Sequence, residues 1–264
     1  MLLSLLMKKQ LILKIKEKKE LSGIEDSVVE KTLNNYLEKY RINFEKISKK
    51  EMKLIVKEVR AVLRNIVGQY RASLKSKEKL LNSNSIHKLL STHSSTKERM
   101  PHYTELKEKI SEINPKSILD LGCGLNPIAL ADKKIKYYAS DINEEDLEII
   151  KKYFSKNKFK GQVFVHDLTQ TEKTLPKADL CLLFKVLDVI DTKNHTLSKE
   201  IIIKTPCKAF LVSFATKKLS GKSMSSPKRF WFENLLMRLK IEFEKFFTNN
   251  EVFYFFKKKT VKPI

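Results

Sequence analysis

The chain has 264 residues, of which 53 are Lys or Arg and 31 are Asp or Glu, so its formal net charge is +22. With 42% hydrophobic residues it can bury the core of one or two domains, and only 6 Gly and 7 Pro exclude collagen-like and linker-rich chains. Three scattered cysteines are too few for a disulfide scaffold or a zinc cluster. Lys8 and Lys9 interrupt the first apolar run, so we expect a soluble, cytoplasmic protein without a membrane partner.

The positive charge is concentrated in the two ends of the chain. Residues 1–100 carry a net charge of +12, residues 101–203 are neutral, and residues 204–264 carry +10. This distribution predicts a small-molecule site between segments that face a polyanion, and we favour nucleic acid as that polyanion. Two alternatives stay open, namely an acidic membrane surface and a Lys-rich composition without function, since only 7 of the 53 basic residues are Arg.

Residues 1–105 are predicted to form a basic, all-helical RNA-binding domain. Helices are expected at about 9–20 and 24–40, then over 49–76, with a connector carrying a short helix over 83–95. Ser48 and Glu51 form a capping box at the start of the long helix. The polar face of that helix is the candidate RNA-binding surface, and it comprises Lys49, Lys50, Lys53, Lys57, Arg60, Arg64 and Arg71.

Residues 106–264 are predicted to form an α/β domain, because short apolar runs suited to buried parallel strands alternate with helical patterns. Strands are expected at 117–121, 137–140, 162–165, 180–184 and 209–213. Helices are expected at about 126–132, 143–156, 193–203 and 228–241. Two last apolar runs, 243–247 and 252–256, predict a terminal antiparallel hairpin. The fold class is therefore a Rossmann-like open sheet, whose ligand should lie at the carboxyl ends of its strands.

The strongest local pattern follows the first strand, where Asp120-Leu-Gly-Cys-Gly leads into a helix. Glycines here allow a sharp turn and a close approach of the backbone to a ligand. About 20 residues later the second strand ends in Asp141, and an acid at this place can bind both hydroxyls of a ribose. The third glycine of the dinucleotide fingerprint is missing, since Asn126 stands four residues after Gly122. A turn whose glycines serve only packing remains the alternative.

The glycine turn resembles motif I of the class I S-adenosylmethionine (SAM) methyltransferases, which also have a terminal reversed hairpin. Further stretches narrow the resemblance to the aminoglycoside-resistance 16S rRNA guanine-N7 methyltransferases. The matching stretches are His93–Arg99 (HSSTKER), Asp120–Pro127 (DLGCGLNP), Leu183–Leu187 (LFKVL), and Lys218–Lys222 (KLSGK) with Phe230–Glu233 (FWFE). The resemblance covers the chain from about residue 85 to the C-terminus, whereas the first 80 residues agree only in helical character and basicity.

The resemblance implies SAM as the cofactor. Arg99 would pair with its methionine carboxylate, and the glycine turn would pass under its methionine and ribose. Asp141 would hold the ribose hydroxyls, while Asp167 and Leu168 would bracket the adenine. The complete implied cofactor set is His93, Thr96, Arg99, Asp120, Gly122, Cys123, Gly124, Asp141, Ile142, Asp167 and Leu168.

The resemblance also implies the methyl-transfer pocket and the substrate. Lys185 and Phe184 would line the pocket, and a loop over residues 217–227 would close over the target nucleotide. Guanine N7 carries a lone pair and no proton, so we expect neither a general base nor a metal. The RNA contacts implied at this end of the chain are Lys218, Lys222, Met224 and Arg229.

The expected function is thus methylation of a decoding-region guanine N7 of 16S rRNA within the 30S subunit, by a monomer. A link to aminoglycoside resistance and a housekeeping role are both open. Two other functions also stay open: a SAM-dependent methyltransferase for another RNA site, and a catalytically inactive RNA-binding factor that keeps the fold.

Overall fold

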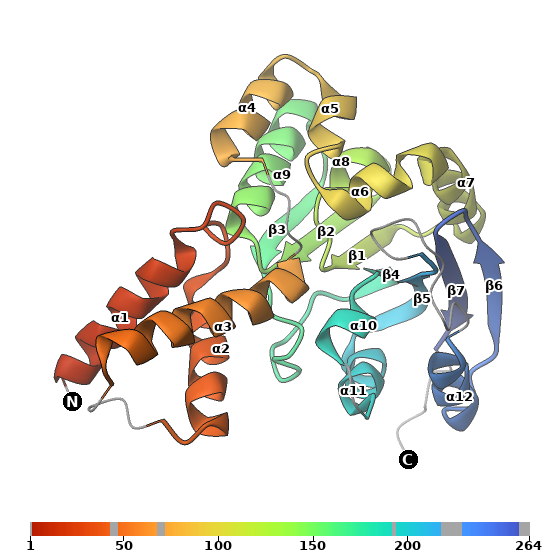
Figure 1. The fold of residues 1–264 in the computed structure, drawn as a ribbon. Coiled ribbons are helices and arrows are strands. Elements are labelled where there is room, and N and C mark those ends of the chain that lie inside the picture. Colours follow the sequence, from red (N-terminus) through yellow and green to blue (C-terminus); the bar gives the residue numbers. More distant parts are fainter. Residues whose placement is uncertain (1, 43–46, 68–71, 192–193, 218–228, 259–264) are drawn as a thin grey trace.

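The structure is a computed structural model that describes residues 2–42, 47–67, 72–191, 194–217 and 229–258 (Figure 1). Its centre is a seven-stranded sheet in the order β3-β2-β1-β4-β5-β7-β6. The strands are β1 (Ser117–Leu121), β2 (Lys136–Asp141), β3 (Gly161–Val165), β4 (Ala178–Phe184), β5 (Cys207–Ala215), β6 (Phe243–Phe247) and β7 (Glu251–Lys257). Strands β1 to β5 pair in parallel, and β7 pairs antiparallel with β5 and β6. The predicted Rossmann-like sheet with a terminal hairpin is confirmed.

Helices cover both faces of this sheet and form a separate group beside it (Figure 1). The N-terminal helices are α1 (Leu2–Lys16), α2 (Asp26–Lys39), α3 (Lys49–Val67), α4 (Leu74–Asn82), α5 (Ile86–Leu90), α6 (Ser94–Arg99) and α7 (Tyr103–Ile113), with a 3-10 turn at Met100–His102. The remaining helices are α8 (Asn126–Leu130), α9 (Glu144–Asn157), α10 (Leu187–Ile190), α11 (Thr196–Lys204) and α12 (Phe230–Arg238).

Alternation along the buried strands divides the core of the sheet into two layers. Ile118 of β1 belongs to the layer that includes residues of α4, α5, α7, α8 and α9, whereas its neighbour Leu119 belongs to the layer that includes residues of α10, α11 and α12. This is the period of two that a strand buried on both faces requires. In the sheet, β1 lies between β2 and β4. The crossover connections therefore run in opposite directions on the two sides of β1, and a crevice opens at the carboxyl ends of β1 and β4.

Helices α1, α2 and α3 form a third core of their own, built from apolar residues between Leu11 and Leu63. Helices α4, α5 and α7 instead share the core of the sheet. The expected boundary after residue 105 therefore falls within α7, among helices whose apolar faces pack on the α/β layer. No helix in the described part of the chain is long and apolar enough to cross a membrane.

The capping box predicted for the long helix is confirmed, since Glu51 accepts from the Ser48 amide at 2.8 Å and Ser48 Oγ accepts from the Glu51 amide at 3.2 Å. The extent of that helix was wrong. Instead of continuing to residue 76, α3 ends at Val67, and α4 begins at Leu74 with Ser73 as its N-cap. A serine that caps a new helix starts a separate element, which apolar periodicity alone does not reveal.

Candidate active site

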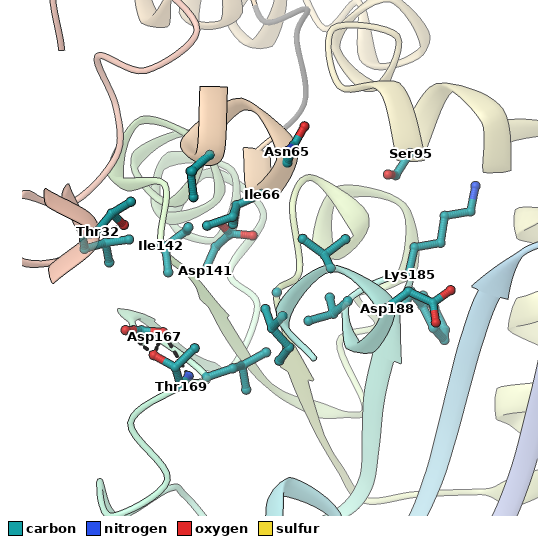
Figure 2. A pocket seen from close by; sticks show the side chains of 18 of the residues that line it. Thr32, Asn65, Ile66, Ser95, Asp141, Ile142, Asp167, Thr169, Lys185 and Asp188 are labelled. Atoms are coloured by element: carbon teal, nitrogen blue, oxygen red, sulfur yellow. Dashed lines mark hydrogen bonds between the residues drawn. The ribbon is translucent and has the colours of Figure 1, made fainter. Parts of the chain in front are cut away.

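A cavity of about 790 Å³ opens at the carboxyl ends of the central strands. One wall comes from α2 and α3, and the other from α6 and the segments that follow β1, β2, β3 and β4. Figure 2 shows Asn65 of α3 and Ser95 of α6 on opposite sides, with Asp141 between the N-terminal helices and the sheet. The cavity carries five carboxylates and five Lys or Arg side chains, so it is balanced in charge although the chain is strongly basic: Glu58, Glu98, Asp141, Asp167 and Asp188 against Lys31, Lys39, Arg99, Lys185 and Lys217.

The turn after β1 places its backbone against the cavity. Gly122 and Gly124 have φ values of +68° and +50°, a left-handed conformation that residues with a side chain rarely adopt. A Cβ on Gly122 would lie 2.6 Å from Val186 Cγ2, and one on Gly124 would lie 2.7 Å from the His93 ring. The buried Cys123 between them donates its amide to the Ser140 carbonyl at 2.9 Å. Both conformation and packing therefore require glycine at these two positions.

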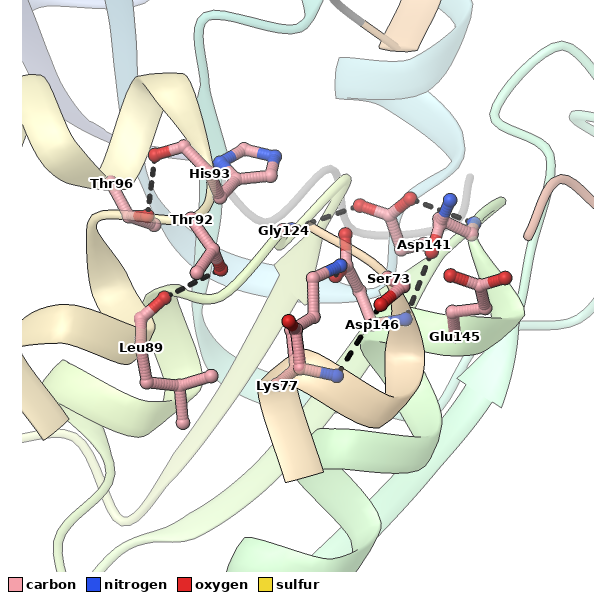
Figure 3. Close-up of polar contacts among 12 residues, drawn as sticks. Ser73, Lys77, Leu89, Thr92, His93, Thr96, Gly124, Asp141, Glu145 and Asp146 are labelled. Carbon is pink, nitrogen blue, oxygen red and sulfur yellow. Dashed lines mark hydrogen bonds and ion pairs between the residues drawn. The ribbon is translucent and has the colours of Figure 1, made fainter. Parts of the chain in front are cut away.

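Asp141 ends β2 and is fixed by two backbone amides, those of Gly124 and Asn143, each at 2.9 Å (Figure 3). Its neighbour Ile142 also lines the cavity and packs against the α1–α3 core. Asn143 caps α9 by accepting from the Asp146 amide at 2.9 Å. The acid that the sequence predicted at the end of β2 is thus held rigidly, with its side chain on the cavity.

The segment after β3 brings a second acid and an apolar residue to the cavity. Asp167 accepts from the Thr169 amide at 2.9 Å and from Lys31 Nζ of α2 at 3.3 Å, and Leu168 beside it is buried. Burial raises the pKa of Asp167, but the hydrogen bonds from Thr169 and the charge of Lys31 outweigh it and hold the pKa below its usual value. Asp167 is therefore ionised at neutral pH.

Arg99 forms the buried polar centre on the opposite side of the cavity. Its Nε and Nη2 donate to the two carboxylate oxygens of Glu251 at 3.0 and 2.9 Å, and Nη1 donates to Asn126 Oδ1 at 2.7 Å. Burial raises the pKa of Glu251, but the charges of Arg99 and Lys185 outweigh this effect and lower it. The guanidinium, expected to pair with a cofactor carboxylate, is here held by a carboxylate of the chain itself.

Lys185 and Phe184 border this polar centre. Lys185 follows β4 with a left-handed φ of +58° and donates from Nζ to Glu98 at 2.6 Å, and Nζ also lies 3.3 Å from Glu251. The Arg99 guanidinium lies 4.8 Å from the centre of the Phe184 ring. Arg99, Phe184 and Lys185 all line the cavity, so the structure brings these three expected residues together.

Three of the expected cofactor residues, Thr96, Asp120 and Gly124, do not line the cavity. Thr96 is buried and donates to the carbonyls of Leu90 and His93 at 2.6 and 3.0 Å, which fixes the start of α6. Asp120 is fully buried in β1 and accepts from the Tyr137 hydroxyl at 2.7 Å. Gly124 lies under the His93 ring, whereas His93, Gly122, Cys123 and Leu168 line the cavity.

The expected RNA-binding residues divide into exposed and internally paired side chains. Lys49, Lys50, Lys53 and Lys57 of α3 are exposed. Three arginines turn inward: Arg60 donates to the Ile15 carbonyl at 3.2 Å, Arg64 to Glu20 at 2.8 Å, and Arg229 to Asp188 at 2.9 Å. The remaining four, Arg71, Lys218, Lys222 and Met224, lie outside the described residues.

Sequence reasoning missed Glu251, Asn126 and Lys31. Glu251 begins β7, and the antiparallel register places it opposite Ala215 at the carboxyl end of β5. A single acid at the start of an apolar terminal strand was the only signal in the sequence. The register of the hairpin would have been needed to bring it to Arg99.

Comparisons with known proteins identify the family of this chain. The model of the family "Ribosomal RNA methyltransferase (FmrO)" matches residues 37–254. The 16S rRNA (guanine(1405)-N(7))-methyltransferase of Serratia marcescens is 31% identical over 216 residues, 79% of this chain and 85% of the relative. The enzyme of the same name from Micromonospora rosea is 32% identical over 141 residues, 51% of each chain. The structure of the 16S rRNA methyltransferase RmtF in complex with S-adenosyl-L-homocysteine shares the fold, with a TM-score of 0.81, 22% identity and coverage of 96% of this chain and 98% of that one. The chain belongs to the FmrO family of ribosomal RNA methyltransferases.

Proposed function

We propose that this protein uses SAM to methylate N7 of the guanine in 16S rRNA that corresponds to guanine 1405 of its relatives. The observation that carries the proposal is the shared cavity, in which the glycine turn, Asp141 and Asp167 face helices of the basic N-terminal segment. The names of the relatives supply the reaction and the RNA. We further propose that the protein acts as a cytoplasmic monomer on the 30S subunit.

The residues of the cavity fit SAM. Its volume lies within the range of about 300–1,000 Å³ that small-molecule sites occupy. Gly122 lines the cavity and leaves room for Val186 beside it, and Asp141 presents a backbone-oriented carboxylate to a ribose. Asp167 and the buried Leu168 would flank an adenine, with Ile142 opposite. When bound, SAM supplies a methyl group activated by a sulfonium.

The chain's own task is then to orient a nucleophile that needs no base. Guanine N7 attacks with a lone pair and releases no proton, so no residue has to remove one. Holding N7 in line with the methyl group can lower the barrier by up to about 7–11 kcal/mol. The rigid groups around this position are Lys185, held by Glu98, and Arg99, held by Glu251. Their fixed charges require no rearrangement when the substrate enters.

The test is methyl transfer from radiolabelled SAM to intact 30S subunits, naked 16S rRNA and bulk tRNA, each offered separately. We expect label on 16S rRNA, with 30S subunits as the best substrate. Label confined to tRNA would keep the enzyme and reject the ribosomal target. SAM binding without transfer to any of the three RNAs would favour the alternative of an inactive RNA-binding factor.

A further inference from the structure

The cavity extends beyond the cofactor residues onto α2 and α3. Its outer wall consists of Val28, Lys31, Thr32, Asn35, Tyr36 and Lys39 from α2, Tyr40 at the C-cap of α2, and Glu58, Val62, Asn65 and Ile66 from α3. These positions recur at spacings of three and four residues, so each set lies along one side of its helix. Leu33 and Leu37 of α2 are buried in the core of the N-terminal helices, and Tyr36 and Ile66 of the wall pack against that core. The wall is thus the side of these helices that faces the cavity.

Two tyrosine rings on this outer wall lie together, and the ring of Tyr40 is open to solvent. The centroids of the Tyr36 and Tyr40 rings are 4.7 Å apart, with 46° between their planes. Tyr40 is 55% exposed, and Tyr36 is half-buried. The ammonium of Lys39 lies 5.1 Å from the centre of the Tyr40 ring. An exposed aromatic pair next to a cation presents flat apolar area and positive charge side by side.

The cation beside the two rings favours a polyanionic partner. Lys39 is exposed and lines the cavity, whereas Lys31, which also lines it, donates to Asp167. The exposed Lys49, Lys50, Lys53 and Lys57 lie on the other side of α3 from the wall. Proteins that bind single-stranded nucleic acid combine these two features, with aromatic rings that stack on bases and cations that follow the backbone. A nucleotide that leaves its helix to enter an active site also disturbs the stacking of the bases beside it. In the proposed reaction, the bases next to the target guanine therefore lose a stacking partner close to this cavity.

We propose that Tyr36 and Tyr40 form a stacking platform for an unpaired nucleotide next to the target guanine. The platform rests on the proposed function, because it requires an RNA whose target base enters the same cavity. It adds a second base-binding position, on the N-terminal helices, to the cofactor and target positions on the sheet. Stacking recognises a ring and not its substituents, so the platform would stabilise the opened RNA without selecting its sequence.

The experiment measures the Kd of purified 30S subunits, by filter binding, for the full-length protein and its variants. Loss of one stacked base corresponds to a weakening of about 5- to 150-fold, so Tyr40→Ala is expected to raise this Kd at least about fivefold. Tyr40→Phe and Tyr40→Trp keep the ring and should stay within about twofold. Phe247→Ala is the matched control, because Phe247 is also 55% exposed but lies on β6. Thermal unfolding and calorimetric SAM binding should be the same in all variants.

Each other outcome overturns the platform in a recognisable way. An unchanged Kd for Tyr40→Ala, in a protein that methylates 30S subunits, rejects the platform and leaves the function standing. Equal losses in Tyr40→Phe and Tyr40→Ala would assign the effect to the hydroxyl, and a parallel loss of SAM affinity would assign the wall to the cofactor. If the wild-type protein neither binds nor methylates 30S subunits, the proposed function fails and the platform falls with it.

Discussion

The backbone amide of Gly124 donates a hydrogen bond of 2.9 Å to the carboxylate of Asp141 and so joins the turn after β1 to the end of β2. The second oxygen of Asp141 accepts from the Asn143 amide at the same distance. The acid is therefore oriented by the backbone of two neighbouring strands before any ligand arrives. Such preorganisation reduces the entropy that binding would otherwise cost.

Replacing Asp141 by alanine should weaken SAM binding by about 10- to 100-fold, which is the effect of losing a hydrogen bond to a charged group. Isothermal titration of the purified variant measures this directly. Asp132→Ala is the control, because Asp132 is an exposed acid before β2, at the other end of that strand. Full SAM affinity in Asp141→Ala would show that the cofactor does not lie against this residue.

Gly124→Ala should destabilise the fold by about 1–2 kcal/mol from its left-handed φ alone, and by more because its Cβ would contact the His93 ring. The double variant with His93→Ala removes the contact and leaves the backbone strain. Urea unfolding should therefore show partial recovery in the double variant. Recovery to the stability of His93→Ala itself would contradict the strain, and no recovery at all would contradict the contact.

Lys77 of α4 and Asp146 of α9 form an ion pair in which both side chains are buried (Figure 3). Removing one partner of such a pair usually costs about 3–5 kcal/mol, so Lys77→Met should lower the free energy of unfolding by that amount. The same two helices supply a matched control in the exposed pair of Lys152 and Glu78. Lys152→Met should cost less than about 1 kcal/mol in the same urea titration. Equal losses in the two variants would show that burial does not set the contribution of Lys77.

The buried Asp120 should make stability fall with rising pH. Burial raises the pKa of Asp120 to about 7, although the Tyr137 hydroxyl and the charge of Arg99 oppose it. Between about pH 4 and pH 7 the unfolded chain has lost this proton while the folded protein keeps it, so the free energy of unfolding decreases as pH rises. Asp120→Asn removes this dependence and should gain stability relative to wild type between pH 5 and pH 8. Urea titrations at these two pH values measure the difference, and parallel profiles would contradict the raised pKa.

The exposed lysines of α3 should contribute to RNA affinity by neutralising phosphates. Lys53→Ala with Lys57→Ala should weaken 30S binding and make the plot of log Kd against log salt shallower by about one for each phosphate that is no longer neutralised. Arg60→Ala is expected to lower stability instead, because the Arg60 guanidinium is bonded to the carbonyls of Lys14 and Ile15. A slope unchanged by the lysine variants, or reduced by Arg60→Ala, would reverse this assignment.

Features set by local sequence were predicted well. The bounds of β1 agree at both ends, and Asp141 lies at the end of β2 because the switch from an apolar strand to a polar helix start is visible in the sequence. The glycine turn also followed from the sequence, since positive φ values and close packing both demand glycine. Each of these depends on residues within one βα unit.

Features set by distant pairings were not predicted. Arg99 and Glu251 are separated by 152 positions, and only the pairing of β5 with β7 brings them together. The inward orientation of Arg60 depends on where α1 packs against α3, which the periodicity of α3 does not fix. The position of Tyr36 and Tyr40 at the cavity depends in the same way on how the N-terminal helices pack beside the sheet.

The most direct test of the central claim is to identify the methylated nucleotide on 30S subunits. After reaction with SAM, nuclease fragments of 16S rRNA are analysed by mass spectrometry, with a reaction without SAM as the control. The account predicts 7-methylguanosine at the guanine that corresponds to guanine 1405 of the relatives, no such product without SAM, and less of it with Asp141→Ala when SAM is limiting. A methyl group on another base, or on another atom of this guanine, would contradict it.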